Sequence, residues 1–312
     1  MLKHTDQQTT SHLLMIRPIA FTYNAETAVN NAFQQKGNAQ NAQQQASLEF
    51  DRFVLKLRNN GIDVTVVQDT PIPHTPDSIF PNNWISFHED GRIVLYPMYA
   101  VNRRAERKQH VLDAIESKFE ILNRLDFTHT ETENRFLEGT GSMVLDRTNR
   151  IAYACISPRT DKALLNEWCN ALQFRPCAFY SVDSNGNEIY HTNVMMCVAD
   201  RYAVVCLESI PDANERQTVV DTLTESGKKI IEISYAQMNA FAGNMLQVRN
   251  REGQPFLIMS SCAYEALRPS QVAELEQMNP IIHSELSVIE TNGGGSARCM
   301  MAEIFLPEKK KS

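Results

Sequence analysis

The repeat that decides the fold is clearest at Asn193-Val194-Met195, Ala199-Asp200 and Ala203-Val204-Val205, where an apolar strand, a turn and a second apolar strand follow one another. Short apolar runs separated by turn residues predict a β-hairpin. A small or polar residue opens the unit, and the unit recurs about every fifty to sixty residues, as in repeat architectures. Four related units begin at Asn83-Trp84-Ile85, Gly141-Ser142-Met143, Asn244-Met245-Leu246 and Arg298-Cys299-Met300.

Helical patterns lie before or between these hairpins, over residues 46–57, 105–119, 161–172, 214–226 and 270–278. Strand pairs that alternate with helices around a repeated unit favour an α/β closed array over a doubly wound sheet. We expect the last strand, 300–306, to pair with the first, 13–19. Closure would bring the residues that open the hairpins to one pocket: Asn83, Gly141, Asn193, Asn244 and Cys299.

Composition excludes several classes of protein. The 312 residues are 43% hydrophobic, and 30 basic against 37 acidic side chains give a net charge of -7. The chain therefore folds, and neither nucleic acid nor an anionic membrane is an expected partner. We predict a flexible N-terminus at 1–12, one catalytic domain at 13–307 and a basic tail at 308–312. The polar N-terminus and the absence of a run of about 20 apolar residues favour a cytoplasmic protein.

Seven cysteines, an odd number without CxxC spacing, argue against a disulfide framework or a zinc site. One of them, Cys299, ends the stretch Gly293-Gly294-Gly295-Ser296-Ala297-Arg298-Cys299. Glycine runs mark close backbone approach, and a positive neighbour such as Arg298 stabilises a reactive thiolate. We therefore identify Cys299 as a candidate nucleophile, the alternative being a buried structural thiol.

Two further residues precede hairpin openings and carry acid–base chemistry. Glu138 lies in Leu137-Glu138-Gly139-Thr140-Gly141, and His191 in Tyr190-His191-Thr192-Asn193. Taken alone, the first is typical of a solvated turn and the second of a structural histidine. Cysteine, histidine and glutamate from separate copies of one repeat instead predict a nucleophile, an acid–base group and an orienting group. The sequence contains no HxxxH, HExxH or DxD cluster, and we therefore predict no metal site.

Four motifs resemble those of the guanidino-group modifying enzymes, or penteins, which include arginine deiminases, dimethylarginine hydrolases and succinylarginine dihydrolase. The similarity runs from Leu13 to Pro307. Its carriers are Phe80-Pro81-Asn82-Asn83-Trp84, Leu137-Glu138-Gly139-Thr140-Gly141, His191-Thr192-Asn193 and the glycine-rich stretch that ends at Cys299. The resemblance implies a five-bladed, pseudo-fivefold α/β propeller that needs neither a metal nor an organic cofactor.

By this resemblance Cys299 attacks the central carbon of a guanidino or ureido group, His191 shuttles protons and Glu138 holds the terminal nitrogen. Arg103 and Arg159 match positions that anchor the carboxylate of an amino-acid substrate, for which a guanidinium fork is suited. The alternative for both arginines is a surface position. The implied partner is a small amino acid, and a homodimer is the assembly we consider.

Two departures from the family pattern bear on the substrate. Deiminases that act on arginine commonly carry aspartates at the positions matched by Asn83 and Asn193. A buried guanidinium needs anionic partners, whereas amides can both donate to and accept from a neutral ureido group. We therefore predict hydrolysis of L-citrulline to ornithine, carbon dioxide and ammonia, as in citrulline hydrolases. Asn244 is the third amide expected in the pocket.

Three alternatives remain open. The first is a deiminase or dihydrolase that acts on arginine, dimethylarginine or an acylated arginine with the same catalytic residues. The second is amidino transfer to an amine. The third is a non-catalytic propeller that binds an amino acid.

Overall fold

The computed structural model describes residues 7–36 and 41–310, whose strands form five three-stranded sheets. In each sheet the middle strand is antiparallel to one neighbour and parallel to the other. In spatial order the sheets are β3 (Ile85–Phe87), β4 (Arg92–Leu95) and β5 (Asn123–Asp126); β6 (Val144–Asp146), β7 (Ile151–Cys155) and β8 (Arg175–Phe179); β9 (Met196–Val198), β10 (Tyr202–Val205) and β11 (Lys229–Glu232); β12 (Leu246–Arg249), β13 (Pro255–Ser260) and β14 (Ile281–Ser284); and β15 (Ala302–Ile304), β1 (His12–Arg17) and β2 (Asp63–Gln68).

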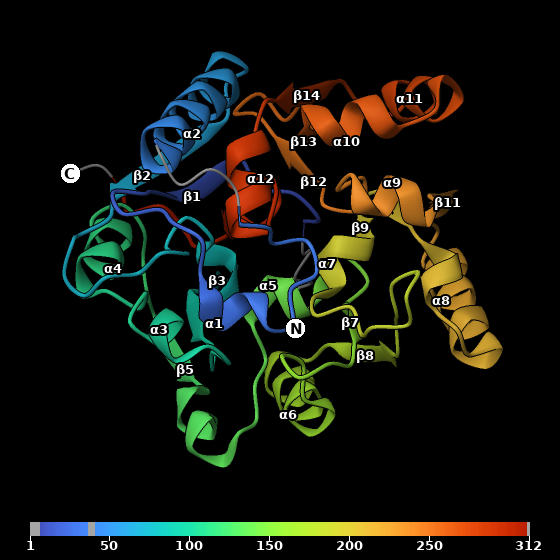
Figure 1. The fold of residues 1–312 in the computed structure, drawn as a ribbon, viewed down its shortest axis with the longest axis horizontal. Helices are drawn as coiled ribbons and strands as arrows, with labels where there is room; N and C mark the ends of the chain where they lie inside the picture. The colour runs from blue at the N-terminus through green and yellow to red at the C-terminus, as the bar shows by residue number, and fades with distance from the viewer. Residues whose placement is uncertain (1–6, 37–40, 311–312) are drawn as a thin grey trace.

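A helix connects the two parallel strands of every sheet, because parallel strands need a crossover that covers the sheet. These crossover helices are α2 (Ala42–Asn59), α4 (Gln109–Glu116), α6 (Lys162–Leu172), α8 (Ala213–Glu225) and α11 (Pro269–Glu276). They lie around the outside of the molecule, with the strands nearer its centre (Figure 1). The five helical patterns of the sequence therefore correspond to the five crossover helices.

The boundaries of two of these helices differ from the prediction. Helix α4 starts at Gln109 rather than 105, because Lys108 is extended and its ammonium group donates to Asp69 Oδ1 at 2.6 Å and Thr75 Oγ1 at 2.9 Å. Helix α2 starts at Ala42 rather than 46, so that Gln43, Gln44 and Gln45 belong to its first turn. The contacts of Lys108 join residues far apart in the chain, so the local sequence pattern could not predict them.

Short helical segments make up most of the remaining regular structure. They are α1 (Ala25–Ala28), α3 (Val101–Arg104), α5 (Gly139–Ser142), α7 (Thr192–Met195), α9 (Tyr235–Asn239), α10 (Ser261–Ala266), α12 (Ser287–Gly293) and the 3₁₀ turns η1 (Pro81–Asn83), η2 (Thr128–Glu133) and η3 (Leu207–Ser209).

The residues that open the hairpins lie in turns and not in the strands, which corrects the prediction. Ser142 belongs to α5, where the amide of Met143 donates to Gly139 O at 3.1 Å, and β6 starts only at Val144. Asn193 belongs to α7 in the same way, before β9. The two turns are joined, since Thr192 Oγ1 donates to Ser142 O at 2.6 Å. The two turns therefore pack against each other ahead of the strands that follow them.

The predicted pairing of the last strand with the first is confirmed. β15 is antiparallel to β1, with Leu14 opposite Ala302. Ahead of β1, Gln8 is buried, and its side chain donates to Leu145 O and Val198 O at 2.9 and 3.0 Å. The segment predicted to be flexible thus makes buried contacts from Gln8 onward, whereas residues 1–6 lie outside the described residues. Residues 311 and 312 of the predicted basic tail also lie outside the described residues.

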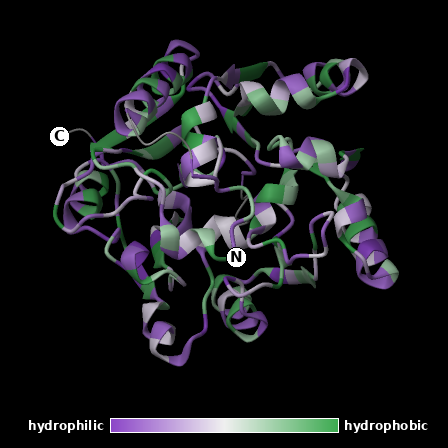
Figure 2. Cartoon of the chain, viewed as in Figure 1, coloured by the Kyte–Doolittle hydropathy of each residue, from purple (hydrophilic) through white to green (hydrophobic). Residues whose placement is uncertain are grey.

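Apolar side chains of the strands and of the inward faces of the crossover helices form the core, and the polar residues of those helices face outward (Figure 2). All seven cysteines are free thiols, and Cys262 alone among them is exposed. Among the helices of the described residues, none combines the length and the apolar composition needed to cross a bilayer.

Candidate active site

A small buried cavity lies where the hairpin openings meet. Asn83, Arg103, Arg159, His191 and Cys299 line it, so five of the eight predicted site residues share its wall. Three more of them, described below, contact these five directly. The cavity volume is about 20 Å³, enough for a water molecule and smaller than an amino acid.

Cys299 ends a turn that its own amide closes, by donating to Ser296 O at 3.0 Å. The thiol is buried, and two amides lie against it. Asn244 Nδ2 is 3.2 Å from Sγ, and Asn193 Nδ2 is 3.6 Å from it. Asn244 Nδ2 also donates to Asn193 O at 2.9 Å, which fixes the two amides relative to each other. The sulfur therefore faces two N–H donors that can stabilise negative charge.

The glycines before Cys299 are required by close packing. Gly294 has a φ of +64°, and a Cβ added there would lie 2.5 Å from Asn31 Nδ2. A Cβ on Gly293 would lie 2.8 Å from the ring of Phe80. Since real Cβ atoms do not approach other atoms so closely, the glycine run is what lets this loop pack against its neighbours.

Arg298 does not have the role that its sequence position suggested. Its guanidinium donates to Met301 O at 2.7 Å and pairs with Glu303 at 2.8 Å. Its backbone amide donates to Asn244 Oδ1 at 3.0 Å. Arg298 thus fixes the side-chain amide of Asn244 beside the thiol. The side chains hydrogen-bonded to the sulfur are those of Asn193 and Asn244.

His191 and Glu138 form a direct pair, with Nε2 2.8 Å from Oε2. The other carboxylate oxygen accepts from the amide of Tyr99 at 2.9 Å. Burial alone would raise the pKa of Glu138, but Arg159, His191 and Arg103 together lower it to about 2. Burial lowers the pKa of His191 to about 4, against the opposing effect of Glu138. At neutral pH the site therefore holds an ionised carboxylate and a neutral imidazole.

Asn83 and His191 meet over the bare Cα of Gly141. A Cβ at Gly141 would lie 2.3 Å from Asn83 Nδ2 and 2.8 Å from His191 Nδ1. Asn83 Oδ1 accepts from Arg103 at 3.0 Å, whereas Nδ2 is buried and has no partner among the described residues. Because a guanidinium only donates, Arg103 fixes the orientation of this amide, with its N–H groups beside the histidine.

Both predicted anchor arginines are buried rather than at the surface. Arg159 donates to Asn30 Oδ1 at 3.0 Å, lies 3.6 Å from Glu138 and packs over the ring of Tyr190. Arg103 makes two bonds to Glu106, at 2.8 and 3.0 Å. These contacts hold both guanidinium groups in the cavity wall.

Asp77 is a wall residue that the sequence reasoning missed. Its Oδ2 accepts from Asn24 at 2.7 Å and from Thr27 at 3.1 Å, but Oδ1 is buried without a partner among the described residues. Burial raises the pKa of Asp77. The sequence around Asp77, Thr75-Pro76-Asp77-Ser78, is typical of an ordinary turn. The sequence signal that could have identified Asp77 is its position three residues before Phe80-Pro81-Asn82-Asn83-Trp84.

Comparison with known families identifies the chain. A family model described as N,N dimethylarginine dimethylhydrolase, eukaryotic, matches residues 17–306. The chain belongs to this family. The sequence-based resemblance to the guanidino-group modifying enzymes is thereby confirmed. Comparison with curated protein sequences found no match.

Solved structures share the fold of this dimethylarginine hydrolase family member. The apo structure of ArgZ, an arginine dihydrolase from the ornithine-ammonia cycle in cyanobacteria, has a TM-score of 0.76 at 16% identity, over 95% of this chain and 41% of that chain. The substrate-bound N-terminal domain of ArgZ has the same TM-score and identity, over 95% and 98%. A dimethylarginine dimethylaminohydrolase variant with an S-methyl-L-thiocitrulline adduct has a TM-score of 0.64 at 12% identity, over 95% and 100%. The α/β fold with small sheets is therefore shared.

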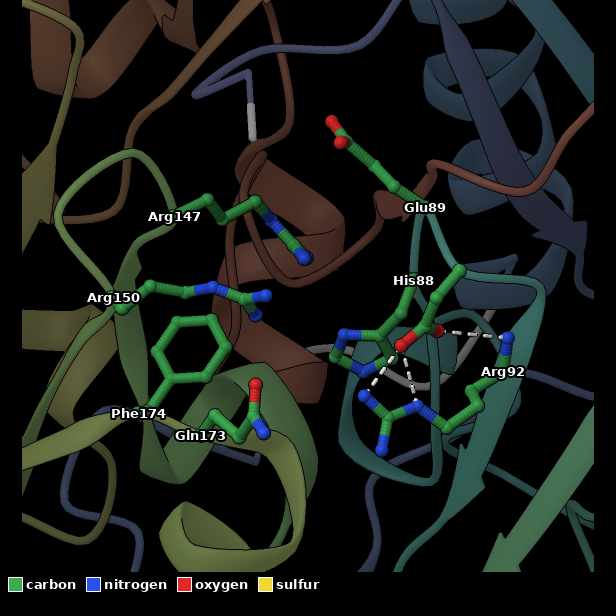
Figure 3. A pocket seen from close by; sticks show the side chains of 8 residues that line it. His88, Glu89, Arg92, Arg147, Arg150, Gln173 and Phe174 are labelled. Carbon is green, nitrogen blue, oxygen red and sulfur yellow. Dashed lines mark hydrogen bonds and ion pairs between the residues drawn. The ribbon is translucent and has the colours of Figure 1, made fainter. Parts of the chain in front are cut away.

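A second cavity of the family member, of about 90 Å³, lies at the turns of two hairpins (Figure 3). Its arginines have structural partners. Arg92 binds Asp90 and donates to Ala171 O at 2.9 Å, and Arg150 donates to Leu172 O at 3.3 Å, so both cap the end of α6. Arg147 stacks over Phe305. No thiol lines this cavity, which makes it a poor candidate for covalent chemistry. In the described residues no three His, Cys, Asp or Glu side chains form a group that could hold a metal ion.

Proposed function

We propose that this protein is a cysteine-dependent hydrolase that converts L-citrulline and water to L-ornithine, carbon dioxide and ammonia. The five sheets would be the blades of a five-bladed propeller whose axis passes through the cavity. The family supports hydrolysis of a C–N bond in a guanidino or ureido amino acid. The choice of citrulline comes from one contact, that of Arg103 with Asn83.

Arg103 forces Asn83 to present its N–H groups at the reacting end of the cavity, beside His191. A ureido group offers a carbonyl oxygen to such a donor, whereas a guanidinium has only donors of its own. A buried, unpartnered amide N–H costs about 1–3 kcal/mol, which a ureido oxygen would recover. The site is thus complementary to a neutral ureido tail.

In the proposed reaction the thiol of Cys299 gives its proton to His191 as its sulfur bonds to the ureido carbon, and one C–N bond breaks as the protonated His191 passes that proton to the departing amine. Asn193 and Asn244 stabilise the charge on the sulfur before attack. Glu138 orients His191 and stabilises its protonated form. Water then attacks the thioester-like carbonyl carbon, the C–S bond breaks, and the remaining carbamate separates into amine and carbon dioxide. Arg103 and Arg159 are the proposed anchors for the substrate carboxylate.

An arginine dihydrolase is the second candidate, and Asp77 favours it. Its unpartnered carboxylate oxygen is an anionic group in the cavity wall, which suits a cationic substrate group. ArgZ, whose fold is similar, is described as an arginine dihydrolase. The substrate's α-ammonium group could also take this oxygen, so Asp77 is compatible with both candidates.

The test is release of ornithine and ammonia by purified protein without added metal, with L-citrulline, L-arginine and dimethylarginine in parallel. Ornithine from citrulline by the intact protein and none from Cys299→Ala supports the proposal. Cys262→Ala, which removes an exposed thiol outside the cavity, is the matched control and should retain activity. If arginine is consumed and citrulline is not, the dihydrolase takes the place of the citrulline hydrolase.

Asn83→Asp tests the contact that carries the choice of substrate. A carboxylate in place of the amide removes the donors beside His191, and we expect turnover of citrulline to fall about tenfold to a thousandfold, the cost of one or two lost hydrogen bonds to the reacting group. Equal loss on citrulline and arginine would remove the argument from Asn83.

A further inference from the structure

The second cavity, at the turns of two hairpins, contains a buried arginine whose guanidinium makes no hydrogen bond to the described residues. Arg147 is 5% exposed, and its Cζ lies 4.0 Å from the ring centroid of Phe305. Its backbone amide donates to Gln8 Oε1 at 2.8 Å, but no bond fixes its side-chain N–H groups. Since a guanidinium has five N–H donors and no acceptor, Arg147 needs acceptor atoms that these residues do not supply.

The carboxylate that pairs with Arg147 is bonded more closely to another arginine. Glu303 Oε1 is 3.8 Å from Arg147 Nε, too far for a hydrogen bond, whereas Glu303 Oε2 accepts from Arg298 at 2.8 Å. Burial lowers the pKa of Arg147, and the charge of Arg298 lowers it further, against the effect of Glu303. Two buried guanidinium groups thus share one carboxylate, which compensates the charge of Arg147 only in part.

The other charged groups of this cavity leave a positive excess in its wall. The charged side chains that line it are Arg92, Arg147, Arg150, Glu89 and Asp90. Asp90 accepts from Arg92 at 2.6 Å, and Glu89 accepts from the backbone amide of Gln7 at 3.0 Å. His88 adds no charge at neutral pH, because burial holds its pKa well below 6.5. Three guanidinium groups and two carboxylates therefore give the wall one net positive charge.

The neutral imidazole of His88 supplies a further donor to the cavity wall. Trp168 Nε1, which can only donate, donates to Tyr96 Oη at 2.9 Å. Every hydroxyl proton then finds an acceptor if Tyr96 donates to Ser86 Oγ at 2.7 Å and Ser86 donates to His88 Nε2 at 2.9 Å. This order leaves the imidazole proton on Nδ1, which has no partner among the described residues. The wall thus offers an uncharged N–H beside its guanidinium groups.

The cavity has room for a small ion. Its volume is about 90 Å³, several times what one water molecule needs. The guanidinium groups of Arg147 and Arg150 extend into it from one side, and His88 lies between them and Arg92 (Figure 3). A guanidinium fork binds two oxygens of one phosphate or carboxylate group in parallel. The donors, the charge and the volume therefore suit an anion with several oxygens.

We propose that this cavity binds a small oxyanion of the phosphate type from solution. The fork of Arg147 donates to two oxygens of the ion, His88 Nδ1 donates to a third, and Arg150 contributes positive charge at the mouth. No residue of this cavity lines the cavity of Cys299, so the inference does not depend on the proposed function.

Calorimetric titration of the purified protein with inorganic phosphate tests the proposal, in a buffer free of phosphate and sulfate. We expect saturable binding of one phosphate per chain, and an unfolding temperature that rises with phosphate concentration. sn-Glycerol 3-phosphate, titrated in parallel, distinguishes the two sources of this chemistry: tighter binding of inorganic phosphate indicates a free ion, and tighter binding of the ester indicates a phosphorylated metabolite. Absence of binding by both, or equal stabilisation by chloride at the same ionic strength, would overturn the proposal.

A variant of Arg147 locates the bound ion. Arg147→Gln removes the fork and its charge, and phosphate affinity should fall about tenfold to a hundredfold, as for the loss of hydrogen bonds to a charged group. Arg216→Gln is the matched control, because Arg216 is a half-buried arginine of α8 that donates to Ile210 O at 3.2 Å and does not line the cavity. Its affinity should equal that of the parent protein. Undiminished binding by Arg147→Gln would place the ion elsewhere and overturn the proposal.

A second variant tests the site without changing a buried residue. Gln173, the C-cap residue of α6, is exposed and lines the cavity. In Gln173→Glu a carboxylate of nearly the same shape repels the ion, and phosphate affinity should fall about twofold to fivefold. Gln277→Glu, at the exposed C-cap of α11 and outside the cavity, should leave the affinity unchanged. Equal affinities for the two variants would contradict an anion site in this cavity.

Discussion

At the scale of single residues, the proposed function depends on side chains that have one polar atom hydrogen-bonded and another polar atom without a partner among the described residues. Asn83 is held by Arg103 through its oxygen and so has only its N–H groups left to offer. Asp77 has one oxygen bonded to Asn24 and Thr27 and the other unpartnered. In both cases a hydrogen bond to a neighbouring side chain determines which atom is left without a partner, and the residue type alone does not.

The histidine gives a pH-dependent prediction for stability. The pKa of His191 is about 4 in the folded protein and 6.5 in an ordinary environment, so between these values the unfolded chain binds a proton that the folded one does not. This contribution to stability is complete above pH 6.5 and is lost as pH falls toward 4. On acidification, wild type should lose up to about 3 kcal/mol more free energy of unfolding than His191→Asn.

Urea denaturation at pH 7 and at pH 4.5 measures this difference. His129→Asn, at an exposed position, is the control and should follow wild type. Parallel losses in wild type and His191→Asn would show that His191 is not buried in its neutral form.

The sequence and the structure differ most at residues whose partners are far away in the chain. Cys299, His191 and Glu138 could be placed in one pocket because each precedes or opens a copy of the same repeat. Asp77 was missed because its burial depends on Asn24 and Thr27, about fifty residues earlier. Arg298 was misjudged because its partner, Glu303, lies in the next strand.

At the scale of elements, the turns that precede the hairpins contribute more residues to the candidate site than the strands do. Apolar runs and turn residues predicted the hairpins and the crossover helices. The same patterns did not distinguish a strand from a single helical turn at Gly141 or Asn193, because a four-residue segment is too short for its periodicity to decide. The contact between Thr192 and Ser142 O that joins α5 and α7 is tertiary.

Gly141→Ala tests the turn that brings Asn83 and His191 together. The added Cβ would lie 2.3 Å from Asn83 Nδ2 and 2.8 Å from His191 Nδ1, so both side chains must move. We expect the turnover rate to fall by about a hundredfold or more, as for a displacement of about 1 Å in a catalytic group. Gly227→Ala, where nothing lies within 4 Å of the added Cβ, should leave the turnover rate unchanged even though its φ of +77° is strained. Comparable rates for the two variants would contradict the close contact at Gly141.

Helix α12 contains a buried glutamate that is hydrogen-bonded to the glycine-rich loop that ends at Cys299. Glu290 Oε1 accepts from Ser296 Oγ at 2.5 Å, and burial raises the pKa of Glu290 to about 7 from 4.5. The folded protein therefore holds a proton that the unfolded chain releases, and stability is lost as pH rises from 4.5 through 7. Over that range wild type should lose up to about 3 kcal/mol relative to Glu290→Gln.

Thermal or urea unfolding across this pH range checks the prediction for Glu290. Glu265→Gln, at an exposed position on α10, serves as the control and should leave the pH dependence as it is in wild type. A pH profile for Glu290→Gln identical to that of wild type would mean that Glu290 is ionised in the folded protein.

At the scale of the whole molecule, the first and last strands complete a single sheet. Leu14, at the centre of β1, is fully buried between β15 and β2. Leu14→Ala should lower the free energy of unfolding by about 2–5 kcal/mol, as for other buried leucines. Leu55→Ala on α2, where the side chain is 59% exposed, should change it by about 0.5 kcal/mol or less. Urea denaturation distinguishes the two, and a small effect at Leu14 would contradict the burial of β1.

The pairing of β1 with β15 also governs when the protein can work. A ribosome makes β1 before the other described strands and β15 after them, so the growing chain has to keep β1 without that neighbour while the four other sheets are made. Cys299 likewise follows the asparagines that contact it, Asn193 by 106 residues and Asn244 by 55. A growing chain thus lacks an assembled nucleophile until Cys299 has followed both asparagines, and the sheet that joins the two ends of the proposed propeller forms only once β15 is available to pair with β1.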